Sequence, residues 1–352
     1  MHASTVAIDL AKEVFELAFA DDRGRVVERK RLSRRAFARA LEQRPPLRVL
    51  MEACGSAHYW ARRFQRLGHA VRLLPARDVR PYVRGNKTDR NDVAGILEAD
   101  RCGDIAGVPV KTPEQQGIQA LHRQREHLKA ERTATINLLR GVLREFGVTI
   151  PAGALKVPAA VRDALEDGDN ELPMPLRYSL DDQLQRLAQL QADMAAIEQR
   201  LEEFADRDVA VQRYRRVPGV GLLTATALRA SAGDLSRFRN GRQFAAWLGL
   251  TPREHSSGQQ RRLGGLTKRG DVYLRTLLVH GARAVLTAAR LKQRRGQPLD
   301  PLQAWALKVQ DARGHNKAAC ALANKLARRL WAMEHHGQAF DPRHVSQRPG
   351  AH

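Results

Sequence analysis

The segments STVAID at residues 4–9 and VFELAFA at residues 14–20 decide the fold expected for the start of the chain. The first is a short apolar run. The second alternates large apolar side chains with smaller or polar ones, as a half-buried strand does. Residues 21–24 supply a turn, and a third strand is expected over residues 25–32. We therefore expect the chain to open with three strands joined by hairpins.

Helices and strands alternate after the third strand. Ser33 is a suitable N-cap for the first helix, and Pro45 and Pro46 stop it. The expected elements are a helix at 33–42, a strand at 47–52, a helix at 57–67 and a strand at 69–74. Three hairpin-connected strands followed by helix, strand, helix and strand form a ribonuclease-H-like order, which is one of several α/β arrangements with this pattern.

Four carboxylates lie where such a fold could bring them together. Asp9 ends the first strand and Glu52 ends the fourth, while Asp89 and Asp92 lie three residues apart at the start of an expected helix. Clustered carboxylates repel one another unless a cation lies between them. Oxygen ligands suit Mg²⁺, or a pair of Mg²⁺ ions that clamp a phosphate. Taken singly, Asp9 is better explained as a turn residue and Glu52 as a surface residue. Asp89 and Asp92 are likewise better explained as a helix cap and a charge that stabilises the helix dipole.

The middle of the chain is expected to be helical. Residues 115–146 form a long amphipathic segment, and residues 180–204 carry apolar side chains at a spacing close to a heptad. A break rich in proline, glycine and acidic residues is expected at 151–175. The two helices fit either an antiparallel coiled-coil arm, which could serve in dimerisation, or a helical linker domain.

The net charge of +22 is distributed unevenly. Residues 1–100 carry +7, residues 101–207 carry −3 and residues 208–352 carry +18. Such a basic region favours a polyanion, because each phosphate contact releases counterions. Nucleic acid is therefore the expected partner. A membrane surface is disfavoured, since no basic amphipathic helix with large apolar residues stands out.

Other classes of protein are disfavoured by simple patterns. No run approaches the ~20 apolar residues of a membrane span, and residues 1–11 lack the order of a signal peptide. Cys54, Cys102 and Cys320 are too widely separated for a disulfide framework or a zinc site. We therefore expect a cytoplasmic protein of two or three domains.

The stretch GLTPREHSSGQQRRLGGLTKRGDVYLR at residues 249–275 has almost no apolar periodicity and is expected to be a loop. Ser257 directly precedes Gly258, and a hydroxyl in a basic, glycine-rich loop could attack a phosphodiester. The alternative is a phosphate-binding loop without chemistry. The candidate phosphate contacts are Arg261, Arg262, Lys268, Arg269 and Arg275.

A second glycine-containing turn opens the basic region. The stretch VPGVG at residues 217–221 resembles a helix–hairpin–helix element, in which the backbone N–H groups near Gly219 and Gly221 would meet a phosphate. The helices expected after it lie at 222–230, 238–248, 271–286 and 316–333. The tail from residue 340 is expected to be disordered.

Together these features resemble the DEDD transposases of bacterial insertion sequences, the group that includes the Piv-type DNA invertases. The stretches that carry the resemblance are 6–12, 51–55, 87–92, 218–249, 256–275 and 313–329. The resemblance implies a RuvC-like, ribonuclease-H-like catalytic domain at 1–105, a helical coiled-coil arm at 106–207 and a mostly helical transposase domain at 208–340 that carries the serine loop. Residues 341–352 would form the tail.

The resemblance also implies a mechanism. The carboxylates of Asp9, Glu52, Asp89 and Asp92 would bind Mg²⁺, with Mn²⁺ as an alternative. Ser257 would attack the DNA backbone and leave a covalent phosphoserine link. Ser256 is the alternative nucleophile, because the family pattern places one serine before the glycine and this chain has two.

The partners implied by the resemblance are DNA, both element ends and target, and a non-coding bridge RNA encoded by the element. Lys87 and the basic residues of the serine loop would contact nucleic acid. Activation of the serine does not require a histidine, although His255 is adjacent in sequence. The long separation between Asp92 and Ser257 motivates a composite active site in a homo-oligomer, a dimer or a tetramer.

Two other functions remain open at this point. A metal-dependent endonuclease of the Holliday-junction-resolving kind would use the four carboxylates and water, without a covalent serine intermediate. A non-catalytic architectural protein would bind DNA or RNA through the basic C-terminal region alone. The four carboxylates disfavour the second alternative, because acidic groups weaken the binding of a polyanion unless a metal reverses the local charge.

Overall fold

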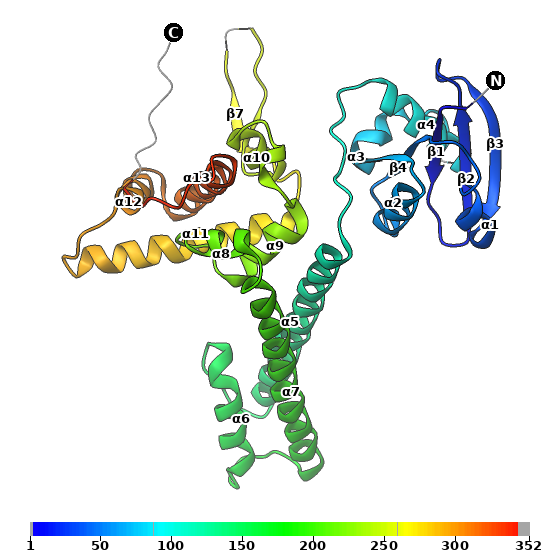
Figure 1. Ribbon diagram of the computed structural model, residues 1–352. Helices are drawn as coiled ribbons and strands as arrows, with labels where there is room; N and C mark the ends of the chain where they lie inside the picture. Colours follow the sequence, from blue (N-terminus) through cyan, green and yellow to red (C-terminus); the bar gives the residue numbers. More distant parts are fainter. Residues whose placement is uncertain (1–2, 87, 259, 344–352) are drawn as a thin grey trace. The chain divides into compact units, whose positions relative to one another are not determined.

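The computed structural model describes residues 3–86, 88–258 and 260–343 (Figure 1). The chain divides into two compact units, Met1–Glu114 and Gln115–His352, and each is described by itself. Among the described residues, no helix combines the length and the apolar character needed to span a membrane.

The first unit contains a five-stranded mixed sheet in the order β3-β2-β1-β4-β5. The first three strands are antiparallel, and β4 and β5 run parallel to β1. The strands are β1 (Thr5–Asp9), β2 (Val14–Ala20), β3 (Val26–Ser33), β4 (Arg48–Glu52) and β5 (Ala70–Leu74). The expected succession of three hairpin-connected strands and two further strands, each preceded by a helix, is confirmed, with ends that differ by about one residue.

The helices of the first unit cover both faces of this sheet. They are α1 (Arg34–Arg39), α2 (Ala57–Arg66), α3 (Ala76–Val79), the 3₁₀ turn η1 (Arg80–Tyr82) and α4 (Asp89–Arg101). Because successive side chains of a strand point to opposite faces, Val6 and Ile8 join an aromatic core with α1 and α2. Ala7 joins a smaller core that includes Val93 and Ile96 of α4. Helix α4 therefore lies on the face of β1 to which Ala7 and Asp9 point.

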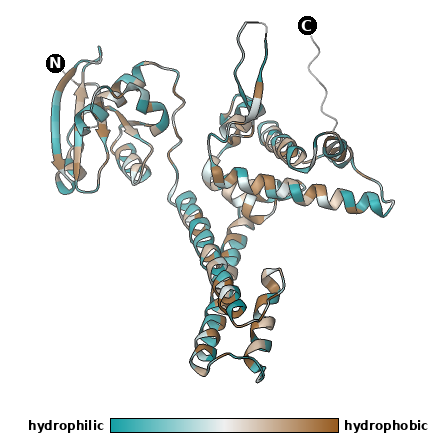
Figure 2. Ribbon diagram, turned by 180° about the vertical axis from the view of Figure 1, so that it is seen from behind, coloured by the Kyte–Doolittle hydropathy of each residue, from teal (hydrophilic) through white to brown (hydrophobic). Residues whose placement is uncertain are grey.

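Two long helices and a short one begin the second unit. They are α5 (Pro113–Glu145), α6 (Val157–Glu166) and α7 (Met174–Ala205), with the 3₁₀ turn η2 (Ala154–Lys156) before α6. Figure 2 shows hydrophobic and hydrophilic residues interspersed along α5 and α7, as in amphipathic helices. The two helices share a core with α6. The prediction that residues 151–175 form a break was wrong for the part that folds into α6. Pro158 lies in the first turn of this helix, where a proline is tolerated.

The remaining helices enclose the largest hydrophobic core among the described residues. They are α8 (Val209–Arg215), α9 (Leu222–Ala232), the 3₁₀ turn η3 (Leu235–Arg237), α10 (Gly241–Trp247), α11 (Val272–Arg294), α12 (Pro301–Arg313) and α13 (His315–His335). Helix α13 packs against α10, α11 and α12. Helix α11 continues beyond its expected end at residue 286, and α12 was not anticipated.

A buried histidine joins α5 to two of these helices. The ring nitrogens of His122 lie 3.0 Å from the hydroxyl oxygen of Tyr273 on α11 and 3.0 Å from that of Thr226 on α9. Burial lowers the pKa of His122 to about 4, so the ring is neutral at neutral pH. This network fixes one end of α5 against the C-terminal helices.

Candidate catalytic and nucleic-acid-binding sites

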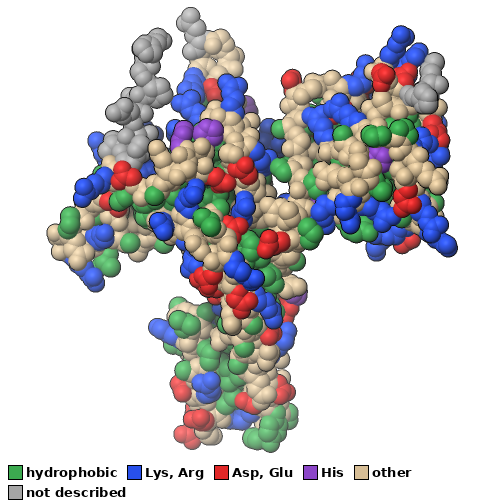
Figure 3. All heavy atoms as spheres, viewed as in Figure 1, with side chains coloured by type: hydrophobic (Ala, Val, Ile, Leu, Met, Phe, Trp, Pro, Cys, Tyr) green, Lys and Arg blue, Asp and Glu red, His purple; other side chains and the backbone are tan. Residues whose placement is uncertain are grey.

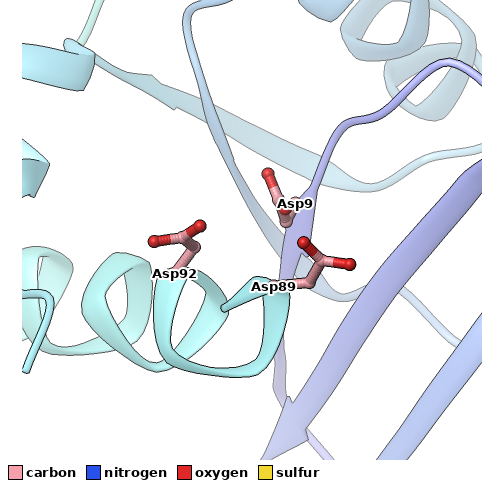
Figure 4. A group of neighbouring side chains, drawn as sticks. All are labelled: Asp9, Asp89 and Asp92. Carbon is pink, nitrogen blue, oxygen red and sulfur yellow. The ribbon is translucent and has the colours of Figure 1, made fainter. Parts of the chain in front are cut away.

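Three of the four predicted carboxylates meet in the first unit. Asp9 is the last residue of β1, and Asp89 and Asp92 lie in the first turn of α4. Their ligand oxygens all lie within 4.8 Å of one another. Figure 4 shows the three side chains gathered between the end of the strand and the start of the helix. This set of oxygen donors fits a hard divalent cation.

Local sequence explains why α4 begins at this point. Thr88 has an extended backbone, and its hydroxyl accepts a hydrogen bond from the Asn91 N–H at 3.3 Å, which caps the helix. Acidic residues in a first turn are stabilised by the helix dipole. Gly95 allows a close approach, since a Cβ there would lie 2.6 Å from Cγ2 of Val83. The cap and the packing together fix the positions of both aspartates.

Glu52 borders this cluster without belonging to it. It ends β4, and the parallel register pairs Ile8 with Met51 and so places Glu52 beside Asp9 at the same edge. Among the described residues, the group within 4.8 Å contains the three aspartates but not Glu52. Burial raises the pKa of the Cys54 thiol, and the negative charges of Glu52 and Asp9 raise it further. Both carboxylates therefore lie near Cys54. Lys87 lies outside the described residues.

Basic residues on β3, which the sequence analysis missed, lie beside the aspartates. Glu16 pairs with Asp9 on one side and with Arg31 on the other, so the three side chains share one face of the sheet. A cavity of about 480 Å³ is lined by Glu16, residues 29–31 and residues 88–90. Among the described residues, Nη1 of Arg29 is buried without a hydrogen-bond partner. Cross-strand register was the signal that could have identified these residues.

The serine-containing stretch is a hairpin in the second unit rather than an irregular loop. Strands β6 (Pro252–Glu254) and β7 (Leu263–Leu266) pair antiparallel, and Ser257 and Gln260 exchange backbone hydrogen bonds near the tip. The pattern was missed because nearly all the described hairpin residues are exposed, so neither face requires apolar side chains. The expectation that this stretch is not a core element is confirmed.

The two serines have different surroundings. The Ser256 hydroxyl donates to the Glu254 carboxylate at 2.8 Å and accepts from the Arg262 N–H at 3.2 Å. The hydrogen bond from Ser256, together with the hydrogen bond and charge of Arg261, lowers the pKa of Glu254. The Ser257 side chain is exposed, and its hydroxyl has no hydrogen-bond partner among the described residues.

The candidate phosphate contacts of this stretch fall into two groups. Arg261 donates to Glu254 at 3.1 Å, and Arg275 donates to the Leu248 carbonyl at 3.1 Å. Both guanidinium groups therefore also form hydrogen bonds that stabilise the local structure. The other three, which are exposed, are Arg262, Lys268 and Arg269. Figure 3 shows Lys and Arg side chains along the exposed hairpin.

The glycines of the predicted helix–hairpin–helix turn also differ. Gly219 has a φ of +82°, and a Cβ there would lie 2.7 Å from the Gly281 carbonyl oxygen of α11. Close packing within the protein therefore requires Gly219. Gly221 precedes α9 as its N-cap, and a Cβ there would meet nothing within 4 Å. Only Gly221 leaves open space beside the backbone.

Comparison with known proteins gives matches over most of the chain. Residues 6–148 match the DEDD transposase model of the IS110 group, and residues 211–296 match the model described as Transposase IS116/IS110/IS902 family. The chain is 44% identical to a protein of Pseudomonas aeruginosa described as "Probable family 20 transposase", over 95% of this chain and 97% of that protein.

Two further relatives are similar along nearly their whole length. The transposase for insertion sequence element IS1111A of Coxiella burnetii is 38% identical over 93% of this chain and 88% of its own. The transposase for insertion sequence element IS1328 of Yersinia enterocolitica is 36% identical over 96% of this chain and 99% of its own length. The chain therefore belongs to the IS116/IS110/IS902 family of DNA transposases, whose DEDD domain implies a divalent metal ion.

Proposed function

We propose that this transposase cuts and rejoins DNA strands with a divalent metal ion at the acidic cluster and with Ser257 as the nucleophile. The observation that carries the proposal is the convergence of Asp9, Asp89 and Asp92, whose ligand oxygens lie within 4.8 Å of one another. Glu52, beside Asp9 at the same sheet edge, would complete the set of four carboxylates. The metal would be Mg²⁺, with Mn²⁺ as the alternative.

The proposed division of the chain assigns one role to each part. Residues 1–105 form a ribonuclease-H-like, RuvC-like catalytic domain, a reading supported by the strand order β3-β2-β1-β4-β5 with a carboxylate at the end of β1. Residues 106–207 form a coiled-coil arm. Residues 208–340 form the basic transposase domain, with a helix–hairpin–helix-like turn near Gly221, and residues 341–352 form the tail.

Ser257 is favoured over Ser256 by its surroundings. The Ser256 hydroxyl is hydrogen-bonded on both sides within the hairpin, whereas the exposed Ser257 hydroxyl has no partner among the described residues. In the proposed step, the Ser257 oxygen bonds to phosphorus and the bond from phosphorus to a deoxyribose oxygen breaks. The serine proton is lost, and the departing oxygen gains one. A bound metal ion would stabilise the charge that develops on the phosphate.

The chain's own residues supply the remaining parts of the proposed reaction. The carboxylates would hold the metal, and the exposed cations Arg262, Lys268 and Arg269 would offset phosphate charge near the serine. Rejoining reverses the serine step with a different deoxyribose hydroxyl. Because one phosphate bond replaces another, the cycle needs no external energy source.

The further partners of the proposal come from the family resemblance. An element-encoded bridge RNA would pair with the donor and target DNA, and sequence choice would then reside in base pairing. The active assembly would be a homo-oligomer in which two subunits share the chemistry. The basic C-terminal region, which carries +18 over residues 208–352, supports binding of nucleic acid. The cytoplasm is the proposed location.

A denaturing gel tests the covalent step. The protein is incubated with Mg²⁺, labelled element-end DNA and RNA transcribed from the element's flanks, and Ser257→Ala and Ser256→Ala are run beside it. We expect a protein–DNA adduct that Ser257→Ala abolishes and Ser256→Ala retains. Cleavage without any adduct, still abolished by Asp9→Ala, would instead support the water-using, Holliday-junction-type nuclease.

A second assay tests the sharing of the site between subunits. Chains carrying Asp9→Ala and Ser257→Ala are mixed, and adduct formation is compared with that of each variant alone. Recovery of the adduct in the mixture is the expected result. If the mixture stays as inactive as its components, each active site must be formed within one subunit.

A further inference from the structure

A large groove lies in the second unit, away from the tip of the serine hairpin. Its volume is about 1570 Å³, and its walls come from α10, α12, α13, the base of the β6–β7 hairpin and the segment that follows α13. Pockets for small molecules are typically about 300–1,000 Å³. The size of this groove therefore favours part of a polymer over a small ligand.

Cations without acidic partners line the groove. They are Arg242, Lys317, Lys325 and Arg328, and the described lining also contains Arg329 and one carboxylate, Asp341. None of the first four cations forms an ion pair with a carboxylate among the described residues. Burial lowers the pKa of Lys325, and the positive charges of Arg329 and Arg328 lower it further. Crowded like charges of this kind are stabilised when an anion binds between them.

Aromatic side chains lie among these cations. The Lys325 ammonium is 4.1 Å from the ring centroid of Trp305 on α12. The indole N–H of Trp331 donates to the Phe238 carbonyl at 2.9 Å, which fixes that ring, and both tryptophans line the groove. Grooves that combine positive charge with aromatic rings bind single-stranded nucleic acid, because the rings stack on bases while the cations hold phosphates.

The hairpin that carries the serines forms one wall. Gly264 and Gly265 of β7 line the groove, and a Cβ at Gly265 would meet nothing within 4 Å. The β7 backbone is thus open to a ligand that approaches closely.

We propose that this groove binds a single strand of DNA, with phosphates against Lys317, Lys325 and Arg328, and leads it along β7 toward the serines. The positive charge and the aromatic rings favour single-stranded nucleic acid over a duplex. The family's action on DNA favours a DNA strand over an RNA strand. Only the destination of the strand rests on the proposed function of Ser257. The groove itself requires neither the metal nor the covalent step.

Fluorescence anisotropy on the full chain tests the groove. A labelled oligo-dT of about 12 nucleotides is titrated at several salt concentrations, with EDTA present so that no cleavage occurs. For the pair Lys317→Gln and Lys325→Gln, we expect at least about a tenfold loss of affinity. The slope of log K against log salt should fall by about 1.4, since each phosphate contact in a single strand contributes about 0.7.

The matched control removes the same charge elsewhere in the second unit. Lys292 on α11 and Lys308 on α12 do not line the groove, so Lys292→Gln with Lys308→Gln should leave affinity within about twofold of the unmodified chain. Equal losses in the two double variants would assign binding to general charge and overturn the proposal. Thermal unfolding confirms that both variants are folded.

A third variant tests contact with β7 without changing charge. Gly265→Ala adds a methyl group that meets no protein atom within 4 Å, so the fold should tolerate it while the bound strand should not. We expect a several-fold loss of affinity with an unchanged salt slope. Unchanged affinity would remove the hairpin from the binding surface and overturn the proposed path.

Binding of other nucleic acids tests which kind of strand occupies the groove. An oligo-dT·dA duplex and an oligo-U of equal length should bind more weakly than oligo-dT, and their affinities should change less in the Lys317→Gln, Lys325→Gln variant. Tighter, lysine-dependent binding of the duplex or of the RNA would overturn the assignment to single-stranded DNA. Because no adduct is measured, failure of the serine proposal would leave these results unchanged.

Discussion

Asp9, Asp89 and Asp92 extend from elements whose apolar residues are buried in the cores on either side of the sheet, whereas the β6–β7 hairpin has almost no buried residue. The acidic cluster is positioned by β1, by the cap of α4 and by the packing of α4 on the sheet. The hairpin is positioned by backbone hydrogen bonds and by a small network around Glu254.

This difference in packing shows how the geometry of each proposed site is maintained. Metal ligands must be held close together against their mutual repulsion, which requires a packed scaffold. A nucleophile on a solvated hairpin can adjust to its substrate, since local stability there is low. We therefore expect substitutions to affect the first site through the fold and the second through local order.

The largest effect is expected for Asp9→Asn, which removes one charge from the cluster and keeps the side chain's size. DNA-strand cleavage should fall by at least about 10³-fold, because the proposed metal ion would supply several kcal/mol of stabilisation to the transition state. Mg²⁺ should raise the melting temperature of the unmodified chain more than that of the variant. Asp22→Asn, in the exposed turn after β2, is the control. Cleavage at the normal rate in Asp9→Asn would exclude the cluster from catalysis.

The next effect concerns the base of the hairpin, where it joins the core. Gly270 has a φ of +107°, and a Cβ there would lie 1.9 Å from the Trp247 carbonyl oxygen. Gly270→Ala should therefore lower the free energy of unfolding by about 3 kcal/mol through strain and overpacking. Denaturant unfolding measures this change.

Gly258→Ala at the hairpin tip is the matched comparison. Gly258 also has a positive φ, +57°, but a Cβ there would meet nothing within 4 Å. The substitution should cost only the backbone strain, about 1 kcal/mol. Because the hairpin frays before the protein unfolds, the free energy of global unfolding should change by much less than this amount. Equal destabilisation by the two variants would show that the tip is as firmly held as the base.

The same difference explains what could be predicted from sequence. The strands of the first unit follow short apolar runs, and Thr88 marks the start of α4, so the approach of Asp89 and Asp92 to Asp9 could be predicted from topology. Packing requires apolar residues at regular spacing, and that requirement leaves a readable pattern. The catalytic roles of these residues stay predictions.

Elements that depend on local hydrogen bonds were harder to predict. The hairpin has two solvated faces and therefore no alternation. Helix α6 has Pro158 in its first turn and lies in the stretch 151–175, whose proline, glycine and acidic residues predict a break. Helix α12 has a capping box between Asp300 and Gln303 that could have been recognised. The groove between α10 and α13 could not be predicted, because its walls come from residues far apart in the chain.

A smaller effect is expected where α4 packs beside the cluster. Gly95→Ala would place a methyl group 2.6 Å from Cγ2 of Val83, at a cost of about 1–3 kcal/mol, and it should weaken Mg²⁺ binding as α4 shifts. Adding Val83→Ala should recover part of the loss. Gly141→Ala on α5 meets nothing within 4 Å and should stabilise the chain by up to about 1 kcal/mol. A Gly95→Ala chain as stable as the Gly141→Ala chain would show that α4 is not tightly packed.

The smallest effect is expected within the hairpin itself. The hydrogen bond from Ser256, together with Arg261, lowers the pKa of Glu254 below 4.5, its ordinary value. A carboxylate with a lowered pKa contributes stability that is present above pH 4.5 and lost as the pH falls through the folded-state pKa. The hairpin should therefore loosen at acidic pH, as the pH falls below 4.5 and through the lowered folded-state pKa, while the rest of the second unit stays folded.

Backbone amide NMR signals of residues 253–263, followed from pH 6 to pH 3, measure this loosening. Glu254→Gln keeps an acceptor oxygen but no charge, so its hairpin should show the weaker order at every pH and no transition. Gln243→Glu, at an exposed position of α10, adds a carboxylate outside the hairpin and should leave the transition unchanged. A transition that survives in Glu254→Gln would mean that another group controls the hairpin. In that case the hydrogen bond from Ser256 would not be what holds the tip, and the preference for Ser257 as the available hydroxyl would lose its structural support.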